Sequence, residues 1–195
     1  MKVAYGFKAH SGWAALVVLG RSEGELVVVE RSRVQLVEEA WAKQPYHAAE
    51  GIEADDARNL VKRGIDAANR IAVRELRAVL AREKKRGNEP VGCAVLVGNP
   101  MPDWSVEQIL AVHFRMHQAE GVLFRDALIN AARKHSLKIM ELPEKTLLSY
   151  SEKALRTSGA DLTQTVSSIG KLAGPPWGKD QKYAALAAMV ALSIS

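Results

Sequence analysis

The sequence predicts an α/β protein built on a five-stranded mixed sheet, with helices on both faces of the sheet. Residues 2–37 contain three β-rich segments joined by short polar turns. A long segment of helical periodicity follows, and two further short apolar runs each come after such a helical segment. Strands joined by short turns pair antiparallel, whereas strands reached through a helix can pair in parallel. The combination predicts a mixed sheet that helices cover on both sides.

The N-terminal strands are predicted from composition. Lys2–Lys8 and Trp13–Leu19 are rich in aromatic residues, valine and leucine, which strands favour. Arg21–Gly24 is polar and ends in glycine, as tight turns do. In the second half of Glu25–Val37 apolar and polar residues alternate, which predicts a third strand with one buried face. We expect Lys2–Lys8 to be central in the sheet, with Trp13–Leu19 antiparallel to it.

The middle of the chain changes from loop to helix to strand. We interpret Glu38–Gly51 as an ordered loop. From Ala54 to about Lys85 apolar residues recur at spacings of three and four, which predicts an amphipathic helix that Gly87–Pro90 ends. The apolar run Val91–Val97 is then typical of a central buried strand.

The C-terminal half is mainly helical. Ser105 and Gln108 have the spacing of a capping box, before a helix expected to reach about Lys134. Leu137–Leu142 is predicted to be the fifth strand. Beyond it we expect helical segments at 144–155, 162–172 and 180–192, the last being rich in alanine and preceded by a rigid loop at 174–178.

Length and composition indicate one globular domain, residues 1–195. Hydrophobic residues make up 48% of the chain and charged residues 25%. No apolar run reaches the ~20 residues of a membrane span, and the start lacks the layout of a signal peptide. The single cysteine, Cys93, lies in an apolar run and is expected to be a buried hydrophobe rather than a nucleophile. We therefore expect a cytoplasmic protein that has no membrane partner.

The basic charge permits binding to DNA, RNA or another polyanion. The formal net charge is +5 and the isoelectric point is about 9.4. Many of the basic residues fall on the predicted helix 54–85, whose end carries Arg82, Lys84, Lys85 and Arg86. Two interpretations stay open for these four residues: a phosphate-binding surface, and a solvated helix face diluted by neighbouring acids.

Three short motifs carry a family resemblance. They are the stretch Gln118–Val122 with its trailing alanines, the stretch Ile139–Pro143 with the lysines that follow it, and the stretch 180–187 with sequence D-Q-K-Y-A-A-L-A. In these motifs and in its order of elements the chain resembles RuvC-type Holliday-junction resolvases, within the ribonuclease H-like superfamily. The resemblance implies a ribonuclease H-like fold over nearly the whole chain. A glycine inside a helix costs about 1 kcal/mol relative to alanine, so Gly121 predicts a close backbone approach.

The resemblance also implies which residues would perform catalysis, and most of them differ here. Metal-dependent phosphodiester cleavage needs about four carboxylates around two Mg²⁺ ions. Lys8 stands where the family has its first aspartate, and Gly98 and Asn99 stand where it has a glutamate. Asp180 matches the first aspartate of the final pair, but Tyr183 replaces the second. An ammonium group in such a centre would repel Mg²⁺.

Other carboxylates offer an alternative catalytic set. Asp103 and Glu120, together with Asp180, are the candidates for a divergent nuclease, with Mg²⁺ as its cofactor. If the chain is not a nuclease, the sequence does not identify a cofactor.

A separate set of residues could bind a transition metal. His113, His117 and Glu120 follow the spacing i, i+4, i+7 and so share one helix face. Two histidines one turn apart are suitable ligands for such a metal. The alternative is a half-buried polar face packed against Trp104.

The remaining candidates would contact nucleic acid. His10 and Ser11 lie at the first hairpin turn, which faces the ligand cleft in ribonuclease H-like folds, and Lys8 lies just before them. Trp177 could stack on a base beside Lys179, although the sequence favours a role in anchoring the final helix.

These observations lead to one functional hypothesis and two alternatives. The hypothesis is a non-catalytic ribonuclease H-like binding module, with nucleic acid or a protein as its partner. The first alternative is the divergent metal-dependent nuclease. The second is a protein–protein interaction or self-assembly domain, in which the alanine-rich end forms the interface of a homodimer.

Overall fold

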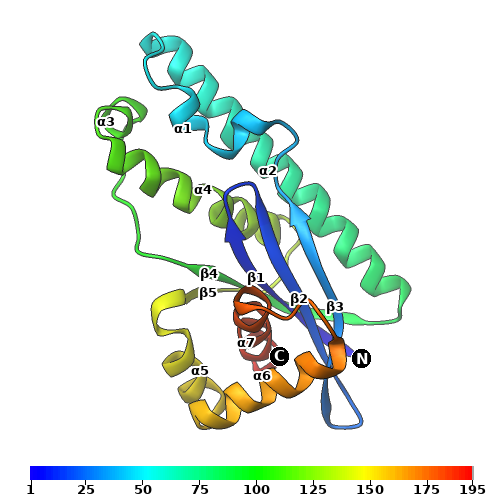
Figure 1. The fold of residues 1–195 in the computed structure, drawn as a ribbon. Helices are drawn as coiled ribbons and strands as arrows, with labels where there is room; N and C mark the ends of the chain where they lie inside the picture. The colour runs from blue at the N-terminus through cyan, green and yellow to red at the C-terminus, as the bar shows by residue number, and fades with distance from the viewer. Residues whose placement is uncertain (195) are drawn as a thin grey trace.

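The computed structural model, which describes residues 1–194, contains a five-stranded sheet with the order β3-β2-β1-β4-β5 (Figure 1). The strands β1 (Lys2–His10), β2 (Trp13–Ser22) and β3 (Glu25–Gln35) form an antiparallel meander. β4 (Glu89–Val97) pairs in parallel with β1, and β5 (Ile139–Pro143) pairs in parallel with β4. The predicted mixed sheet with the first strand at its centre is confirmed.

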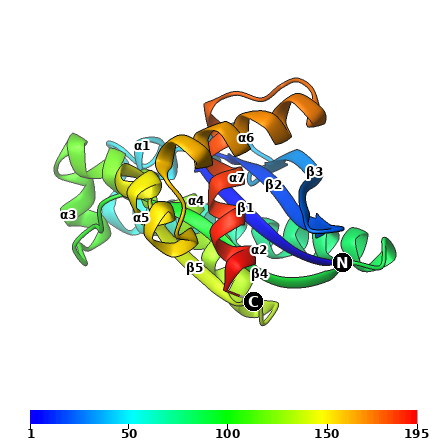
Figure 2. The ribbon, with the colours of Figure 1, turned by 90° about the horizontal axis from the view of Figure 1, so that it is seen from below.

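Helices cover both faces of the sheet, as expected (Figures 1 and 2). The helices α2 (Ala54–Lys85) and α4 (His113–Lys134) pack on the face to which Tyr5 and Phe7 point. The helices α5 (Leu147–Leu155), α6 (Gly159–Ala173) and α7 (Lys179–Ser193) belong to the core on the other face. None of the helices within residues 1–194 has the length and apolar character needed to span a membrane.

Four short helical elements complete the fold. They are η1 (Ala40–Lys43), α1 (Pro45–Ala48), α3 (Val106–Leu110) and η2 (Glu144–Thr146). The first two lie inside the predicted loop 38–51. The single helix expected over 106–134 is divided into α3 and α4, because Val112 adopts an extended conformation and begins α4 as its N-cap residue. The capping box of Ser105 and Gln108 is present at the start of α3.

The helix α7 lies directly on the central strand, and Gly6 permits this contact. A Cβ atom at Gly6 would lie 1.8 Å from the carbonyl oxygen of Ala184. The facing side of α7 is buried and largely alanine, so two backbones approach closely here. The interpretation of the alanine-rich end as a homodimer interface is wrong, because residues 184–188 and 190–192 of α7 are buried in the chain's own core.

Gly121 does not have the close backbone contact that was predicted for it. A Cβ atom at this position would meet only the Arg125 guanidinium, at an ordinary 3.6 Å. The glycine is exposed on α4. It therefore lowers the stability of the helix without any packing reason that the structure shows.

Gly6→Ala and Gly121→Ala should change stability in opposite directions. We expect Gly6→Ala to lower the free energy of unfolding by about 1–3 kcal/mol or more, because the added methyl overlaps the α7 backbone. Gly121→Ala should raise it by up to about 1 kcal/mol through helix propensity. Urea denaturation followed by circular dichroism measures both, and an unchanged Gly6→Ala protein would contradict the role given to this contact.

Candidate functional site

The carboxyl ends of β1 and β5 meet the start of α7, and a lysine lies at their centre. The Nζ atom of Lys8 lies 2.5 Å from Oε1 of Glu144 and 3.6 Å from Oδ1 of Asp180. The ring of Tyr183 faces the same ammonium, with its centroid 4.9 Å away. Lys8 is only 7% exposed. The Lys8 centre, defined as Lys8, Glu144, Asp180 and Tyr183, thus holds a buried internal cation between two carboxylates.

The loop before α7 is fixed by contacts that place Asp180. The guanidinium of Arg31 on β3 donates hydrogen bonds to the carbonyl oxygens of Gly174, Pro175 and Pro176. The Trp177 indole Nε1–H donates to the Val166 carbonyl oxygen at 3.0 Å and fills the space beside Gly170. Trp177 therefore anchors α6 and the loop, while Lys179 is exposed, with its Nζ 5.3 Å from the Tyr183 ring centroid.

His10 borders the Lys8 centre, and Ser11 lies outside it. The Nε2 atom of His10 is 3.0 Å from Oδ2 of Asp180, and its ring stacks on Trp13 with centroids 4.3 Å apart. Ser11 is exposed at the hairpin turn, which Gly12 closes with a φ of +82°. Of these two candidates only His10 adds a contact to the centre.

A second cation lies at the end of β4, where the resemblance places a glutamate. A Cβ atom at Gly98 would lie 2.5 Å from Nη1 of Arg125 on α4. Burial lowers the pKa of this guanidinium, and the charges of Asp126 and Glu144 partly oppose that effect. Arg125 also lines a groove of about 470 Å³ with Gly98, Asn99, Glu141 and Pro143. Both strand ends that would supply metal ligands thus have a cation beside them.

The three carboxylates proposed for a divergent nuclease do not come together. Asp103 is exposed on the loop before α3, and Glu120 is buried and binds His47. Asp180 contacts Lys8 and His10. Within residues 1–194 the one group of three or more potential metal ligands is His47, His113 and His117, so the expected catalytic set does not form a metal centre in this structure.

The histidine cluster differs from its prediction in one member. His113 and His117 are together, with their Nε2 atoms 3.1 Å apart. The third ligand position is taken by His47 of α1, whereas Glu120 accepts hydrogen bonds from the His47 backbone and ring. Sequence spacing could not identify His47, because it comes from a segment far from α4. Glu144 and Arg125 were also missed, although Glu144 lies only two residues beyond the predicted strand Leu137–Leu142 and directly follows β5.

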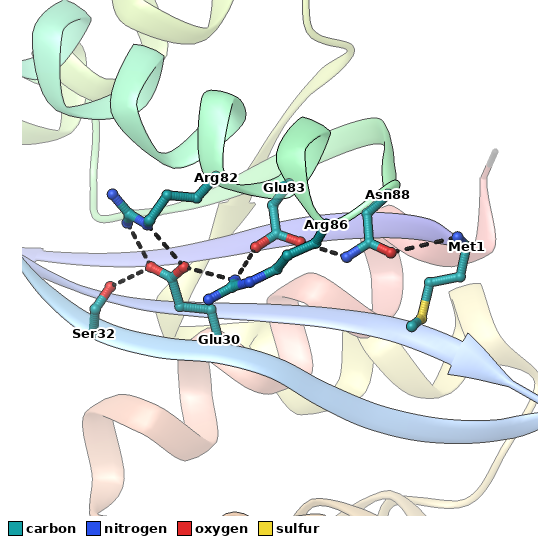
Figure 3. Close-up of polar contacts among 7 residues, drawn as sticks. All are labelled: Met1, Glu30, Ser32, Arg82, Glu83, Arg86 and Asn88. Carbon is teal, nitrogen blue, oxygen red and sulfur yellow. Dashed lines mark hydrogen bonds and ion pairs between the residues drawn. The ribbon is translucent and has the colours of Figure 1, made fainter.

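The basic residues at the end of α2 divide into the pair Arg82 and Arg86, which have acidic partners (Figure 3), and the pair Lys84 and Lys85. The Arg82 guanidinium donates to Glu30 at 2.6 and 3.1 Å, and Arg86 donates to Glu30 and to the fully buried Glu83. Lys84 and Lys85 are exposed, and their side chains form no hydrogen bond or ion pair within residues 1–194. The arginines therefore tie α2 to β3, and only the two lysines offer unpaired charge.

The carboxylate of Glu30 makes this attachment pH-dependent. Burial alone would raise the pKa of Glu30, but hydrogen bonds from Arg82, Ser32 and Arg86 outweigh it and lower the pKa. Because the pKa is lower in the folded state, the pairing stabilises the protein above the ordinary glutamate range. The stabilisation is lost as the pH falls through the lowered value.

A cavity of about 210 Å³ adjoins the Lys8 centre. Glu144 and Tyr183 line it with the exposed residues Lys145 and Lys182, and its remaining walls are mainly apolar. Pro143 lines the groove at Arg125, and the next residue, Glu144, lines the cavity, so the two depressions are neighbours. Both depressions lie at the carboxyl end of the sheet, and we call the two of them the recessed edge.

Comparison with known structures identifies the fold. The structure of RuvC from Thermus thermophilus is similar, with a TM-score of 0.50 at 14% sequence identity over 96% of this chain and 92% of that chain. The same enzyme in complex with a Holliday junction substrate gives a TM-score of 0.50 at 13% identity, over 96% and 91% of the two chains. The chain has a RuvC-like ribonuclease H fold.

A yeast mitochondrial Holliday junction resolvase, Ydc2, is a more distant match, with a TM-score of 0.42 at 12% identity over 97% of this chain and 78% of that chain. No model of a protein family and no curated protein sequence matches the chain. The likeness therefore identifies the fold, while the chemistry of this RuvC-like fold follows from its own residues.

Removing the Lys8 ammonium should destabilise the protein. Lys8→Met leaves Glu144 and Asp180 facing each other without the buried cation, and we expect a loss of about 3 kcal/mol in the free energy of unfolding. Exposed Lys182→Met on the same edge is the matched control and should change stability by less than about 0.5 kcal/mol. Equal effects of the two substitutions in urea denaturation would contradict a buried ion pair.

Neutralising the two pairs at the end of α2 should have unequal effects. The double variant Arg82→Gln/Arg86→Gln should lose about 1–3 kcal/mol at pH 7, because Glu30 and Glu83 lose their partners. Lys84→Gln/Lys85→Gln, with the same change in charge, should be nearly neutral. The difference between them should be smaller at a pH well below the ordinary glutamate range than at pH 7, because the pairing with Glu30 is lost as the pH falls through its lowered pKa. Thermal unfolding at the two pH values tests this, and a constant difference would be evidence against pairing with Glu30.

Proposed function

We propose that this chain is a non-catalytic ribonuclease H-like module that binds nucleic acid at the carboxyl edge of its sheet. The observation that carries the proposal is the Lys8 ammonium between Glu144 and Asp180. At the position that the resemblance gives to a metal-binding aspartate, this chain has its own cation. The two carboxylates are thereby occupied by an internal charge rather than left to bind Mg²⁺.

Electrostatic repulsion argues against the binding of a divalent metal ion at the Lys8 centre. At 4 Å two like unit charges repel by about 4 kcal/mol when the effective dielectric constant is near 20, and a divalent ion doubles that value. Arg125 adds a further positive charge at the end of β4. The alternative nuclease would also need Asp103, Glu120 and Asp180 in one place, and these residues have separate surroundings.

Nucleic acid is the partner that the recessed edge favours. Lys145, Lys179 and Lys182 surround the Lys8 centre and are exposed, so their charges can contact phosphates. The net charge of +5 acts in the same direction. The similar RuvC of Thermus thermophilus is known in complex with a Holliday junction, which supports a DNA junction as the first ligand to test.

The proposal includes a cytoplasmic location for the protein and limits the surface that a protein partner could use. The one cysteine, Cys93, is fully buried, and burial raises the pKa of its thiol to about 12, so it is suited to remain a reduced core residue in the cytoplasm. A protein partner or a homodimer would have to use a surface other than the alanine-rich part of α7, because its residues 184–188 and 190–192 are buried in the chain's own core.

DNA binding should depend on the edge lysines and on salt. We expect the triple variant Lys145→Glu/Lys179→Glu/Lys182→Glu to bind a four-way junction more weakly than the wild type. Its slope of log K against log salt should be smaller by up to about 3, because each lost phosphate contact removes about 0.9. Fluorescence anisotropy of a labelled junction, measured at salt concentrations from about 50 to about 300 mM, gives the slope.

Lys84→Glu/Lys85→Glu provides the comparison surface for that experiment. If this pair weakens binding more than the edge triple does, the interface lies at the end of α2. Absence of binding to junction, duplex and single-stranded DNA or RNA at low salt would reject nucleic acid as the partner and favour a protein.

The same junction should not be cleaved. We expect no product with Mg²⁺ or Mn²⁺, and none from Lys8→Asp, because Arg125 still lies where the second carboxylate would be needed. Gel electrophoresis of an end-labelled junction gives the readout. Metal-dependent cleavage that Asp180→Ala abolishes would show that the chain is a nuclease after all.

A further inference from the structure

Three histidines from two separate segments converge away from the Lys8 centre, where α1 meets the start of α4. His47 lies on α1, and His113 and His117 lie on the first turns of α4. One ligand nitrogen from each residue lies within 4.8 Å of the other two. We propose that this cluster is a zinc site, in which His47, His113 and His117 are the ligands and Glu120 orients His47.

The pair on α4 already has nearly the spacing of zinc ligands. The Nε2 atoms of His113 and His117 are 3.1 Å apart. With Zn–N bonds of 2.0–2.1 Å, two nitrogens of a tetrahedral site lie about 3.3 Å apart. Both side chains are exposed, so small rotations can open the pair to this spacing.

His47 is held in the orientation and tautomer that a metal ligand needs. Its Nδ1–H donates to Oε2 of Glu120 at 2.8 Å, and its backbone N–H donates to Oε1 of the same carboxylate at 3.1 Å. Glu120 is 5% exposed, so this is a buried carboxylate dedicated to one histidine. Donation from Nδ1 leaves a lone pair on Nε2.

That lone pair has no partner within the chain. Nε2 of His47 is buried and makes no hydrogen bond, although the rings of His113 and His117 lie 5.0 and 4.6 Å from the His47 ring. An unsatisfied buried acceptor is costly, and a metal ion would satisfy it. A carboxylate bonded to the far nitrogen of a ligating histidine is the usual outer support of a zinc ligand.

The donor set selects the class of metal. Three neutral imidazoles suit Zn²⁺ and related transition metals, whereas Mg²⁺ and Ca²⁺ prefer oxygen ligands. Three protein ligands leave a fourth position, and the exposure of His113 and His117 gives water access to it. The single carboxylate, Glu120, takes the supporting position.

Binding would join two parts of the fold that have few other polar contacts. The segment 40–49 contains η1 and α1, and the hydrogen bonds of His47 to Glu120 connect it to α4. A metal that ligates residues on both sides stabilises the folded form because it does not bind the unfolded chain as well. The site is independent of the proposed binding to nucleic acid at the sheet edge.

The test uses the full-length protein without a polyhistidine tag, stripped of metal and titrated with ZnCl₂ by calorimetry. We expect about one equivalent of Zn²⁺ to bind with micromolar or tighter affinity and to raise the midpoint of thermal unfolding by several degrees, with no effect of MgCl₂. CoCl₂ should give the strong visible absorption of a tetrahedral site. Failure to bind Zn²⁺ in this range would overturn the proposal.

Variants assign the ligands. His113→Ala and His117→Ala alter exposed side chains, so both should fold, and each should weaken zinc binding by at least about 10-fold. Glu120→Gln should weaken it by about 10–100-fold while retaining the tetrahedral cobalt spectrum. His135→Ala, at the other end of α4, is the matched control and should bind zinc as the wild type does. Wild-type affinity in both His113→Ala and His117→Ala would show that the metal binds elsewhere.

Discussion

The close contact of α7 with β1 at Gly6 determines where the charged groups of the sheet edge lie. Without a side chain at Gly6, and with alanines on the facing side of α7, the two backbones can meet. Lys8 comes two residues later and therefore points to the same face of the sheet. The first turn of α7 then places Asp180 beside the Lys8 ammonium. A packing constraint in the core thus fixes the geometry of the polar centre.

The Lys8 centre is organised around the Lys8 ammonium, and this cation makes the centre an ion pair. A buried ammonium is tolerated only when anions compensate it, and Glu144 and Asp180 do so here. The aromatic face of Tyr183 completes the surroundings of Lys8. The fold that this chain shares with RuvC from Thermus thermophilus is therefore combined, in this chain, with an arrangement of charge that resembles a structural ion pair more than a metal centre.

The sequence predicted the fold better than the site, and the reasons are physical. Strand alternation, helical spacing and the Ser105 capping box are local signals, and they gave the correct order of elements. The division at Val112 was missed because no proline or glycine marks it. Site contacts such as Lys8 with Glu144 or His47 with Glu120 join residues far apart in the chain, so spacing within one helix could not identify them. Gly121 was misjudged because composition alone does not distinguish a required glycine from an exposed one.

Net charge acquires functional meaning only when the partners of each basic residue are known. The dense basic end of α2 has the stronger sequence signal, yet Arg82 and Arg86 are used to hold buried carboxylates of β3 and α2. At the sheet edge Lys145, Lys179 and Lys182 have no acidic partner within residues 1–194, whereas the end of α2 has two such lysines. Phosphate binding gains free energy by releasing counterions from charges that are not already neutralised. The edge with more unpaired lysines is for this reason the more suitable surface for a polyanion, and it lies at the end of the sheet where α7 places the Lys8 centre.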